Sequence, residues 1–170
     1  MKMTSAYANK AIKKLNEDKG FWRRKEMDGN SYIAAVDEEP VIPEYDYSEV
    51  AAIIEEIDIK VSKIKHAINL ANATTKLCVS GEEISVDTIL VRMAQLNQRK
   101  AFLDEMRKQS PKERISSGYV SARKASPEYR YINYDLDLVK AEYEKVDALI
   151  AEYQMALDKY NQTVEFEVEI

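Results

Sequence analysis

The sequence predicts an all-α protein whose long, heptad-patterned helices pack in an antiparallel helical bundle or coiled coil. Two segments repeat apolar residues at alternating steps of four and three, the spacing that lines up side chains along one face of a helix. Only four Gly and four Pro occur in 170 residues, too few for a turn-rich β fold. Apolar residues make up 45% and charged residues 32%, which is typical of a folded chain. We therefore expect one helical domain over residues 1–170.

The N-terminal part of that domain, residues 1–46, predicts one helix and an extended connector. The helix has a capping residue at Thr4 or Ser5 and continues to about Met27, after which a Gly-containing turn ends it. Residues 31–36 are typical of a short strand or an extended arm. Residues 37–46 are acidic and contain two prolines, and they therefore predict an extended connector.

The predicted helical core covers residues 47–170 and is dominated by its first and last helices. Each carries an unbroken line of apolar residues, which we call a heptad seam, because helices with this pattern pack at shallow angles with interlocked side chains. The first begins at Tyr47 or Ser48, and the last runs over about 135–161. The two seams are Val50, Ile54, Ile57, Val61, Ile64, Ile68 and Ala71, and Val139, Tyr143, Val146, Ile150, Tyr153, Leu157, Tyr160 and Val164.

The core also contains a third helix, a loop and two short β segments. The helix begins near residue 85 after a turn at Ser80-Gly81, and it ends before Pro111. Residues 110–127 are polar and basic and predict a long loop, so that 110–134 form a basic region rich in Tyr and Arg. Alternating patterns over about 128–134 and 163–170 predict a short β arm or hairpin. The second of these would pair with the first or with another subunit.

Motifs of catalysis and metal binding do not occur in the sequence. It contains no phosphate-binding glycine loop, no GxSxG elbow and no HExxH pair. The single histidine, His66, has no sequence neighbour that would orient it as a general base. One histidine and one cysteine, Cys78, cannot supply the usual ligands of a zinc site. We expect a protein that is not an enzyme and that has no metal or other cofactor.

The cellular location follows from the same kind of pattern. The N-terminus lacks the apolar run of a signal peptide, and no stretch approaches the ~18 consecutive apolar residues of a membrane span. A single cysteine excludes an internal disulfide and favours a reducing compartment. The prediction is a cytoplasmic protein with no membrane partner.

The charge is unevenly distributed along the chain. The formal net charge is −5, but nine bases and four acids lie between Arg99 and Arg130, so that this segment carries +5 and the rest −10. A basic segment attracts a localised anion, whereas the acidic remainder disfavours a general nucleic-acid coat. We therefore expect no sequence-specific nucleic-acid partner. A solvated charged surface explains the same pattern and stays open as the alternative.

Two clusters of polar residues are candidates for ligand binding. One lies at the end of the first core helix, where amides and hydroxyls either bind a ligand or satisfy the helix end. The other lies in the basic region, where Tyr rings can stack on a base and Arg can hold a phosphate, or where both can form a subunit contact. The candidates are Asn69, Asn72 and Thr75 in the first cluster, and Arg114, Arg123, Tyr129, Arg130, Tyr131 and Tyr134 in the second.

The segment 67–103 resembles a conserved block of the septicolysin-like family of small helical bacterial and phage proteins. That block has the form IN-x-x-N-x-x-T, then SG, then L-x-R-x-x-x-L, and the C-terminal helix of the family carries LD-x-x-x-Q. The matching positions are Ile68, Asn69, Asn72, Thr75, Gly81, Leu90, Arg92 and Leu96, and then Leu157, Asp158 and Gln162. The chain departs from the family at Val164-Glu165-Phe166, where the family carries an Asn-Trp pair. The resemblance implies an all-helical oligomer and adds Arg92 to the candidate residues.

The overall pattern is also similar to that of small helical proteins carried by phages and mobile elements, some of which capture nucleotide signals made by host defences. We expect a non-enzymatic homo-oligomer that sequesters a small anionic, nucleotide-type ligand at its subunit junctions. The alternative is a structural or adaptor coiled-coil protein, whose seams recruit a helical partner.

Overall fold

The computed structural model describes residues 1–115 and 128–169, and 66% of these residues are helical. The helices are long, as the sparse glycines and prolines predict, and the short strands form antiparallel pairs. Contacts divide the chain into two compact units. Unit 1 contains Met1–Leu77, Ser85–Asp87 and Leu157–Ile170, and unit 2 contains Cys78–Ile84 and Thr88–Ala156. A single domain stays a prediction, and we describe each unit by itself.

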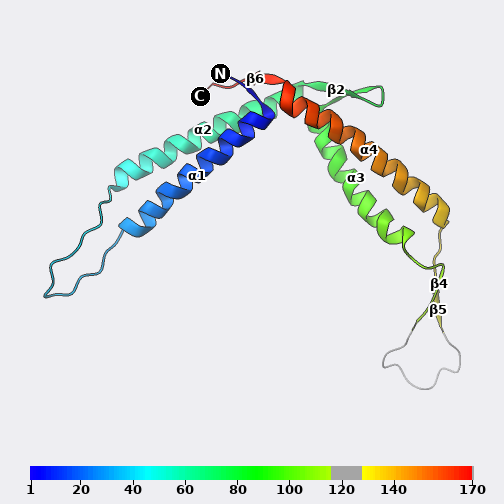
Figure 1. Cartoon of the computed structure of the whole chain (residues 1–170), viewed down its shortest axis with the longest axis horizontal. Helices are drawn as coiled ribbons and strands as arrows, with labels where there is room; N and C mark the ends of the chain where they lie inside the picture. The colour runs from blue at the N-terminus through cyan, green and yellow to red at the C-terminus, as the bar shows by residue number, and fades with distance from the viewer. Residues whose placement is uncertain (116–127, 170) are drawn as a thin grey trace, which may run out of the picture. The chain divides into compact units, whose positions relative to one another are not determined.

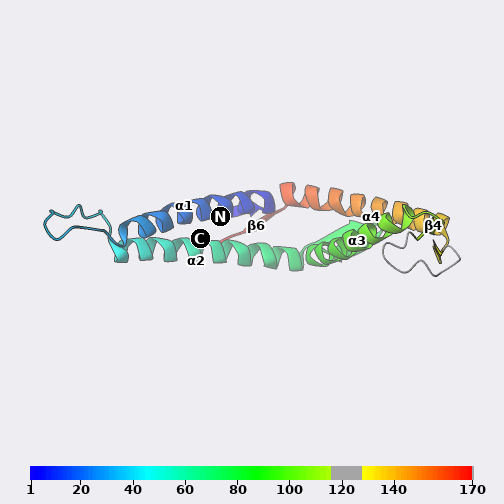
Figure 2. The ribbon, with the colours of Figure 1, turned by 90° about the horizontal axis from the view of Figure 1, so that it is seen from below.

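Unit 1 is built on two helices that lie side by side, α1 (Ser5–Gly29) and α2 (Tyr47–Thr74) (Figures 1 and 2). Both helices begin at a predicted position. A side chain caps each start: the Thr4 hydroxyl accepts a hydrogen bond from the Tyr7 amide, and the Asp46 carboxylate accepts one from the Glu49 amide.

The heptad seam of α2 contributes three of the seven buried residues of the core of unit 1. Five of the seam's seven residues are buried, and Ile68 packs against the core from its edge. The seam of α2 meets the apolar face of α1, as the spacing predicts. The buried residues of this core are Met3, Ala8, Ile12, Ile57, Val61, Ile64 and Val168.

A two-stranded sheet closes one end of unit 1. Strand β1 (Lys2–Thr4) pairs with β6 (Glu165–Glu167) in antiparallel register, with Met3 opposite Phe166. The C-terminal strand therefore pairs with the N-terminal strand and not with residues 128–134, one of the two partners that the sequence suggested; pairing with another subunit stays a prediction. Met3 and Val168 are buried in the core beside α1 and α2, and this apolar burial selects the N-terminal segment as the partner of β6.

The connector between α1 and α2, all of which the structure describes, contains no helix or strand from residue 31 to residue 46. It is an extended arm rather than a strand, one of the two forms that the sequence allows. Its return to the helices is tightly packed, because a Cβ at Gly29 would lie 2.6 Å from that of Tyr45. The glycine thus allows the close approach of the Tyr45 side chain to the end of α1.

Unit 2 contains most of α3 (Val86–Arg107) and α4 (Leu136–Thr163), which lie side by side in Figures 1 and 2. Leu103 of α3 is buried with Val139 and Val146 of the α4 seam, and Leu96 and Tyr143 pack against them. Lys100, which interrupts the apolar face of α3, forms an ion pair with Asp147 of α4. The two helices are therefore joined by apolar burial and by a charged pair at their surface.

A β hairpin that the sequence did not predict precedes α3. Strands β2 (Lys76–Val79) and β3 (Glu82–Ser85) flank the predicted turn, where Ser80 and Gly81 have φ angles of 50° and 79°. The Glu152 carboxylate of α4 accepts hydrogen bonds of 2.7 Å from both the Ser80 amide and the Ser80 hydroxyl. This contact fixes the turn to α4 and compensates for the left-handed backbone of Ser80.

A second hairpin lies between α3 and α4. Strand β4 (Lys112–Arg114) pairs with β5 (Tyr129–Tyr131) in antiparallel register. The strand predicted within 128–134 is confirmed, although it is shorter. Residues 112–114, predicted as loop, are a strand, because the partner strand supplies backbone hydrogen bonds that a local pattern does not reveal.

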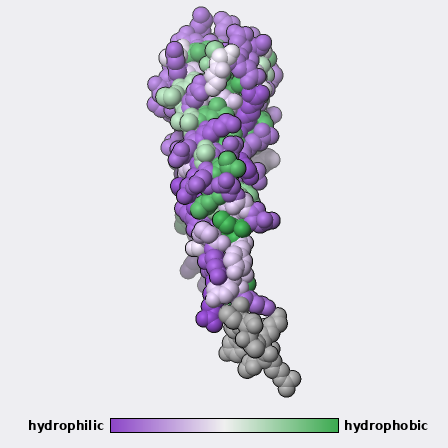
Figure 3. Space-filling model, turned by 90° about the vertical axis from the view of Figure 1, so that its right-hand side faces the viewer, coloured by the Kyte–Doolittle hydropathy of each residue, from purple (hydrophilic) through white to green (hydrophobic). Residues whose placement is uncertain are grey.

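The surface of the described residues is not uniformly polar. Figure 3 shows apolar side chains, in green, between the hydrophilic side chains of one face. Exposed apolar residues of α3 and α4 include Leu90, Phe102, Leu138 and Met155. The described helices therefore retain apolar surface outside their cores.

Candidate ligand-binding site on the β4–β5 hairpin

The pairing of β4 and β5 places three candidate side chains and that of Lys112 on one face of the hairpin. Lys112 lies opposite Tyr131, and Arg114 lies opposite Tyr129. Opposed residues of an antiparallel pair project to the same side, and so do residues two apart on one strand. We call Lys112, Arg114, Tyr129 and Tyr131 the tyrosine face.

Backbone hydrogen bonds show that the tyrosine face is built from closely spaced pairs. The Ile115 amide donates to Glu128 O at 3.0 Å, and the Ile132 amide donates to Pro111 O at 3.3 Å. These bonded pairs alternate with non-bonded pairs, so the pairs Lys112–Tyr131 and Arg114–Tyr129 are of the non-bonded kind. In such pairs the Cα atoms are only about 4.5 Å apart, and their side chains are closer together.

Lys112, Tyr129 and Tyr131 of the tyrosine face lie close to one another, and all four residues of the face are exposed. The two rings have centroids 6.4 Å apart and are tilted by 50°. The Lys112 ammonium lies 4.3 Å from the centroid of Tyr129 and 5.6 Å from that of Tyr131, which are cation–π distances. Tyr129 is 38% exposed and Tyr131 62% exposed. Two aromatic rings and two cations therefore share an accessible surface.

Arg130 projects from the other face of the hairpin. It lies opposite Glu113, and both residues alternate with the residues of the tyrosine face. The sequence grouped Arg130 with Tyr129 and Tyr131 because the three are consecutive. The pleat of a strand separates them, so the cations beside the rings are Lys112 and Arg114.

Tyr134, another candidate, connects the segment after β5 to α3. Its hydroxyl donates a hydrogen bond of 2.8 Å to the Met106 carbonyl near the end of α3, and Gln109 Oε1 lies 3.3 Å away. Its ring packs against the core of unit 2. Tyr134 thus fixes the segment that follows β5 to the end of α3, and it is not part of the tyrosine face.

Arg92 of α3 is engaged within unit 2. Its guanidinium forms a 3.2 Å ion pair with Glu82 and lies 3.4 Å from the Tyr153 hydroxyl. The hydrogen bond to Tyr153 and then the contact with Glu82 raise the pKa of Arg92. These contacts join α3 to β3 and to α4.

The first polar cluster belongs to unit 1, and two of its three residues form hydrogen bonds within that unit. Asn72 Oδ1 accepts a 3.2 Å hydrogen bond from the hydroxyl of the buried Tyr160. Thr75 ends α2: its amide donates to Ala71 O at 2.9 Å, and its carbonyl accepts from Val86 at 3.0 Å. Asn69 is exposed. These contacts agree with a helix end satisfied by its own residues.

Two further basic residues, Arg123 and Lys112, differ in how they relate to the predicted site. Arg123 lies outside the described residues. Lys112, which contacts both rings, was not among the candidates. The sequence contained one signal that could have identified Lys112. The strand of Tyr129 and Tyr131 was predicted, and a strand needs a partner; Lys112 and Arg114 lie two residues apart in the basic loop, the spacing that places two side chains on one face of such a partner strand.

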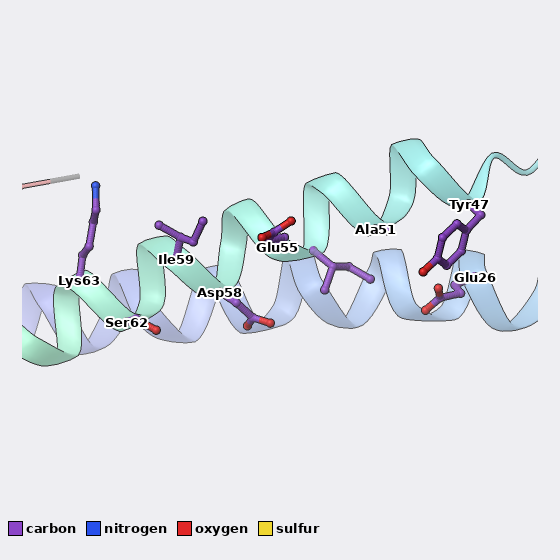
Figure 4. A pocket seen from close by; sticks show the side chains of 9 residues that line it. Glu26, Tyr47, Ala51, Glu55, Asp58, Ile59, Ser62 and Lys63 are labelled. Atoms are coloured by element: carbon purple, nitrogen blue, oxygen red, sulfur yellow. The ribbon is translucent and has the colours of Figure 1, made fainter.

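A surface groove of about 570 Å³ lies along the first half of α2, away from all the candidate residues. Figure 4 shows Tyr47 and Glu26 pointing toward one another at one end of the groove and Lys63 at the other. Glu55 and Asp58 make it acidic, and Asp58 is already paired with Lys19 at 2.6 Å. Its charge does not suit an anionic ligand.

Within residues 1–115 and 128–169, no group of three or more His, Cys, Asp or Glu side chains is placed to hold a metal ion. Among the described helices, none has the length and apolar character needed to cross a membrane.

The residues that the structure describes form helix pairs with short antiparallel β pairs. No protein-family model matches the chain, and no curated protein matches it. A solved structure of a functionally unknown conserved protein from Corynebacterium diphtheriae is similar, with a TM-score of 0.64 and 12% sequence identity. The match covers 98% of this chain and 100% of that one. At this identity the likeness shows a shared fold alone, and the resemblance to the septicolysin-like family stays a prediction.

Proposed function

We propose that this protein binds a small anionic, nucleotide-type ligand on the tyrosine face and holds it without chemical change. The observation that carries the proposal is the placement of Lys112, Arg114, Tyr129 and Tyr131 on one accessible face of the hairpin. Sequestration of the ligand by a homo-oligomer is the function that fits this arrangement best. Assembly of the helix pairs into a bundle belongs to the same proposal.

The chemistry of the tyrosine face suits a nucleotide for two reasons. Aromatic rings stack on the flat faces of bases with little dependence on base identity. Lysine and arginine form charge-assisted hydrogen bonds with phosphate, and arginine does so with two parallel bonds. In the described geometry the Lys112 ammonium rests on the rings, so we expect the ligand to displace it and the ammonium to move to a phosphate.

The test is calorimetric titration of the full-length protein with linear and cyclic nucleotides. Lys112→Ala and Arg114→Ala should each weaken binding by roughly 1.5–3 kcal/mol, the usual contribution of a hydrogen bond to a charged group. Arg130→Ala is the matched control, because it removes one positive charge from the same strand pair on the other face. Affinity of the wild type should also fall with added salt.

The outcome that contradicts the proposal is equal weakening by all three substitutions, since a general charge effect would not distinguish the faces. An absence of binding across the panel would also contradict it. Chromatography of the nucleotide after incubation tests for turnover: the ligand should be recovered unchanged, and a product would assign the protein to the enzymes.

An adaptor protein is the second candidate function, and the exposed apolar residues of α3 favour it. Leu90 and Val91 are exposed near the start of α3, and Phe102 is exposed further along it. A helical partner would cover such a surface. If the protein is an adaptor, Phe102→Asp should abolish partner capture and leave nucleotide binding intact. If the protein is a nucleotide binder, Tyr131→Ala should abolish nucleotide binding and leave partner capture intact.

A further inference from the structure

The unpaired edge of β6 and a surface groove beside it form an interaction surface in unit 1. We propose that this edge binds an extended peptide segment of a partner protein, in which basic and apolar residues alternate. The segment adds to β6 as a further strand, a known mode of peptide recognition. The surface lies in unit 1, so the proposal does not depend on the tyrosine face of unit 2.

Strand β6 is paired along one edge only within the residues that the structure describes, and its neighbour is β1. The Val168 amide donates to Met1 O at 2.8 Å, and the Met1 nitrogen donates to Val168 O at 2.9 Å. The hydrogen-bonding groups of successive strand residues alternate between the two edges. The amides and carbonyls of Glu165 and Glu167 therefore point away from β1, and an edge of this kind is a template for another strand.

A groove of about 520 Å³ lies beside this unpaired edge. Strand β6 packs against α2, whereas β1 packs against α1, so the unpaired edge is on the α2 side. The side chain of Leu70, which lines the groove, is 57% exposed. A strand added to β6 directs every second side chain to the side of Phe166, where it covers apolar surface. The apolar residues that line the groove are Ala67, Leu70, Ala71 and Phe166.

The other side of β6 carries a row of carboxylates. Glu165, Glu167 and Glu169 occupy alternate positions, so they project to one side of the extended chain, and all three are exposed. Two lysines are near, Lys2 opposite Glu167 in β1 and Lys63 in the groove. None of the three carboxylates forms an ion pair with a described residue. The row is therefore available to bases of another chain.

The two sides of β6 together define the pattern of the partner strand. Opposite charges that face each other across a strand pair stabilise it, and like charges destabilise it. The residues opposite the glutamates are therefore Lys or Arg, and the residues between them are apolar and lie over the groove. A second copy of β6 does not fit this edge, because its own glutamates would lie opposite those of the first copy.

The test is NMR titration of the protein with synthetic peptides. The probe is an acetylated and amidated heptapeptide, Lys-Val-Lys-Val-Lys-Val-Lys. One comparison peptide has Glu in place of Lys, and another has the same composition with all lysines before the valines. The probe should shift the amide signals of residues 165–169 and of Leu70. It should bind about tenfold or more tightly than either comparison peptide, because it alone places bases and apolar residues on the correct sides.

Methylated peptides test the strand pairing itself. Every second amide of an added strand donates to β6, so methylation of one alternate set of amide nitrogens should abolish binding, and methylation of the other set should be tolerated. Loss on methylation of the lysine amides indicates an antiparallel strand, and loss on methylation of the valine amides a parallel one. Equal effects of the two sets would overturn the proposal.

Protein variants locate the surface on the chain. Glu165→Gln combined with Glu167→Gln should weaken binding of the probe by about fivefold or more. Leu70→Ser should weaken it by about threefold, because apolar contact is lost. Glu17→Gln combined with Asp18→Asn is the matched control, since it removes two carboxylates from exposed positions of α1 in the same unit. The control should retain the affinity of the wild type.

Equal weakening by the two double substitutions would overturn the proposal, since a general charge effect does not depend on the unpaired edge. Equal affinity for the three unmethylated peptides, or no binding of the probe, would also overturn it. Analytical ultracentrifugation tests the other occupant. An oligomer that becomes a monomer in the Glu165→Gln and Glu167→Gln variant would assign the edge to a second copy of the chain in place of a partner peptide.

Discussion

At the scale of single residues, polar side chains that the sequence suggested as ligand contacts are engaged in holding the fold. Tyr160 is 1% exposed, and its buried hydroxyl requires a partner, which Asn72 supplies. Arg92 and Tyr134 are engaged in the same manner by Glu82 and by the Met106 carbonyl. Residue types that suit ligands therefore also suit the joints between helices, and only their partners distinguish the two uses.

The role of Asn72 gives a first prediction. Asn72→Ala should lower the free energy of unfolding by about 1–3 kcal/mol, because it leaves the buried Tyr160 hydroxyl without its partner. Urea titration followed by circular dichroism measures this change. Asn69→Ala, at an exposed position of the same helix, should leave the stability unchanged. Loss of nucleotide affinity in Asn72→Ala, with stability intact, would return Asn72 to the ligand site.

The Glu152–Ser80 contact gives a prediction about pH. The hydroxyl and the amide of Ser80 donate hydrogen bonds that lower the pKa of Glu152. Because the pKa is lower in the folded than in the unfolded state, this contact stabilises the fold fully above the unfolded pKa, and the stabilisation is lost as the pH falls through the folded pKa.

We therefore expect the melting temperature of the wild type to fall more steeply from about pH 7 to about pH 3 than that of Glu152→Gln. At neutral pH the variant should be the less stable of the two, and the difference should diminish in acid. Parallel melting curves across the range would show that Glu152 does not contribute this pH dependence. Thermal melts at a series of pH values measure both proteins.

At the scale of the secondary-structure elements, the contribution of a helix seam to the stability of its core can be measured. Ile57 of the α2 seam is 7% exposed, whereas Ile59, two residues further along the same helix, is 50% exposed. The two positions differ in burial and share residue type and helix. They therefore provide a matched pair for testing whether the seam stabilises unit 1.

Ile57→Asp should destabilise the protein by roughly 3 kcal/mol or more, because it places an unpaired charge in an apolar core. Ile59→Asp should change the free energy of unfolding by less than about 0.5 kcal/mol, as is usual for exposed positions. Denaturant unfolding followed by the far-ultraviolet helical signal compares the variants. Equal effects of the two substitutions would show that the α2 seam is not buried in solution.

At the scale of the whole molecule, the proposed homo-oligomer would account for the exposed apolar residues. Leu138 and Met155 of α4 are more than half exposed, and Phe102 of α3 is 55% exposed. Apolar surface of this kind is commonly covered in a homo-oligomer. The proposed bundle, completed by neighbouring subunits, would remove these side chains from water.

Analytical ultracentrifugation should accordingly give a mass well above the 19.5 kDa of one chain. Met155→Lys and Phe102→Lys should shift the distribution toward the monomer without loss of helical signal, since both residues are exposed in the single chain. A monomer at all concentrations would remove the oligomer and leave a monomeric binder as the remaining form of the proposed function.

The sequence by itself determined the helices and most of their buried faces. Steps of four and three place side chains on one side of a helix whatever the neighbours are, so the seams of α2 and α4 follow from local spacing. The Thr4 cap of α1 acts within one turn, and its position could therefore also be predicted. The strand that contains Tyr129 and Tyr131 was predicted for a similar reason, because 128–134 shows strand-like alternation.

Only the tertiary structure decided which strands pair and which charges stand beside the tyrosines. An alternating segment can form a strand with any suitable partner, so the sequence could not select residues 2–4 for β6 or residues 112–114 for β5. The partner of β6 lies at the other end of the chain, where burial of Met3 and Val168 in one core stabilises the pairing. The register of β4 against β5 then places Lys112 beside the rings and Arg130 on the other face, because successive side chains of a strand point to opposite sides.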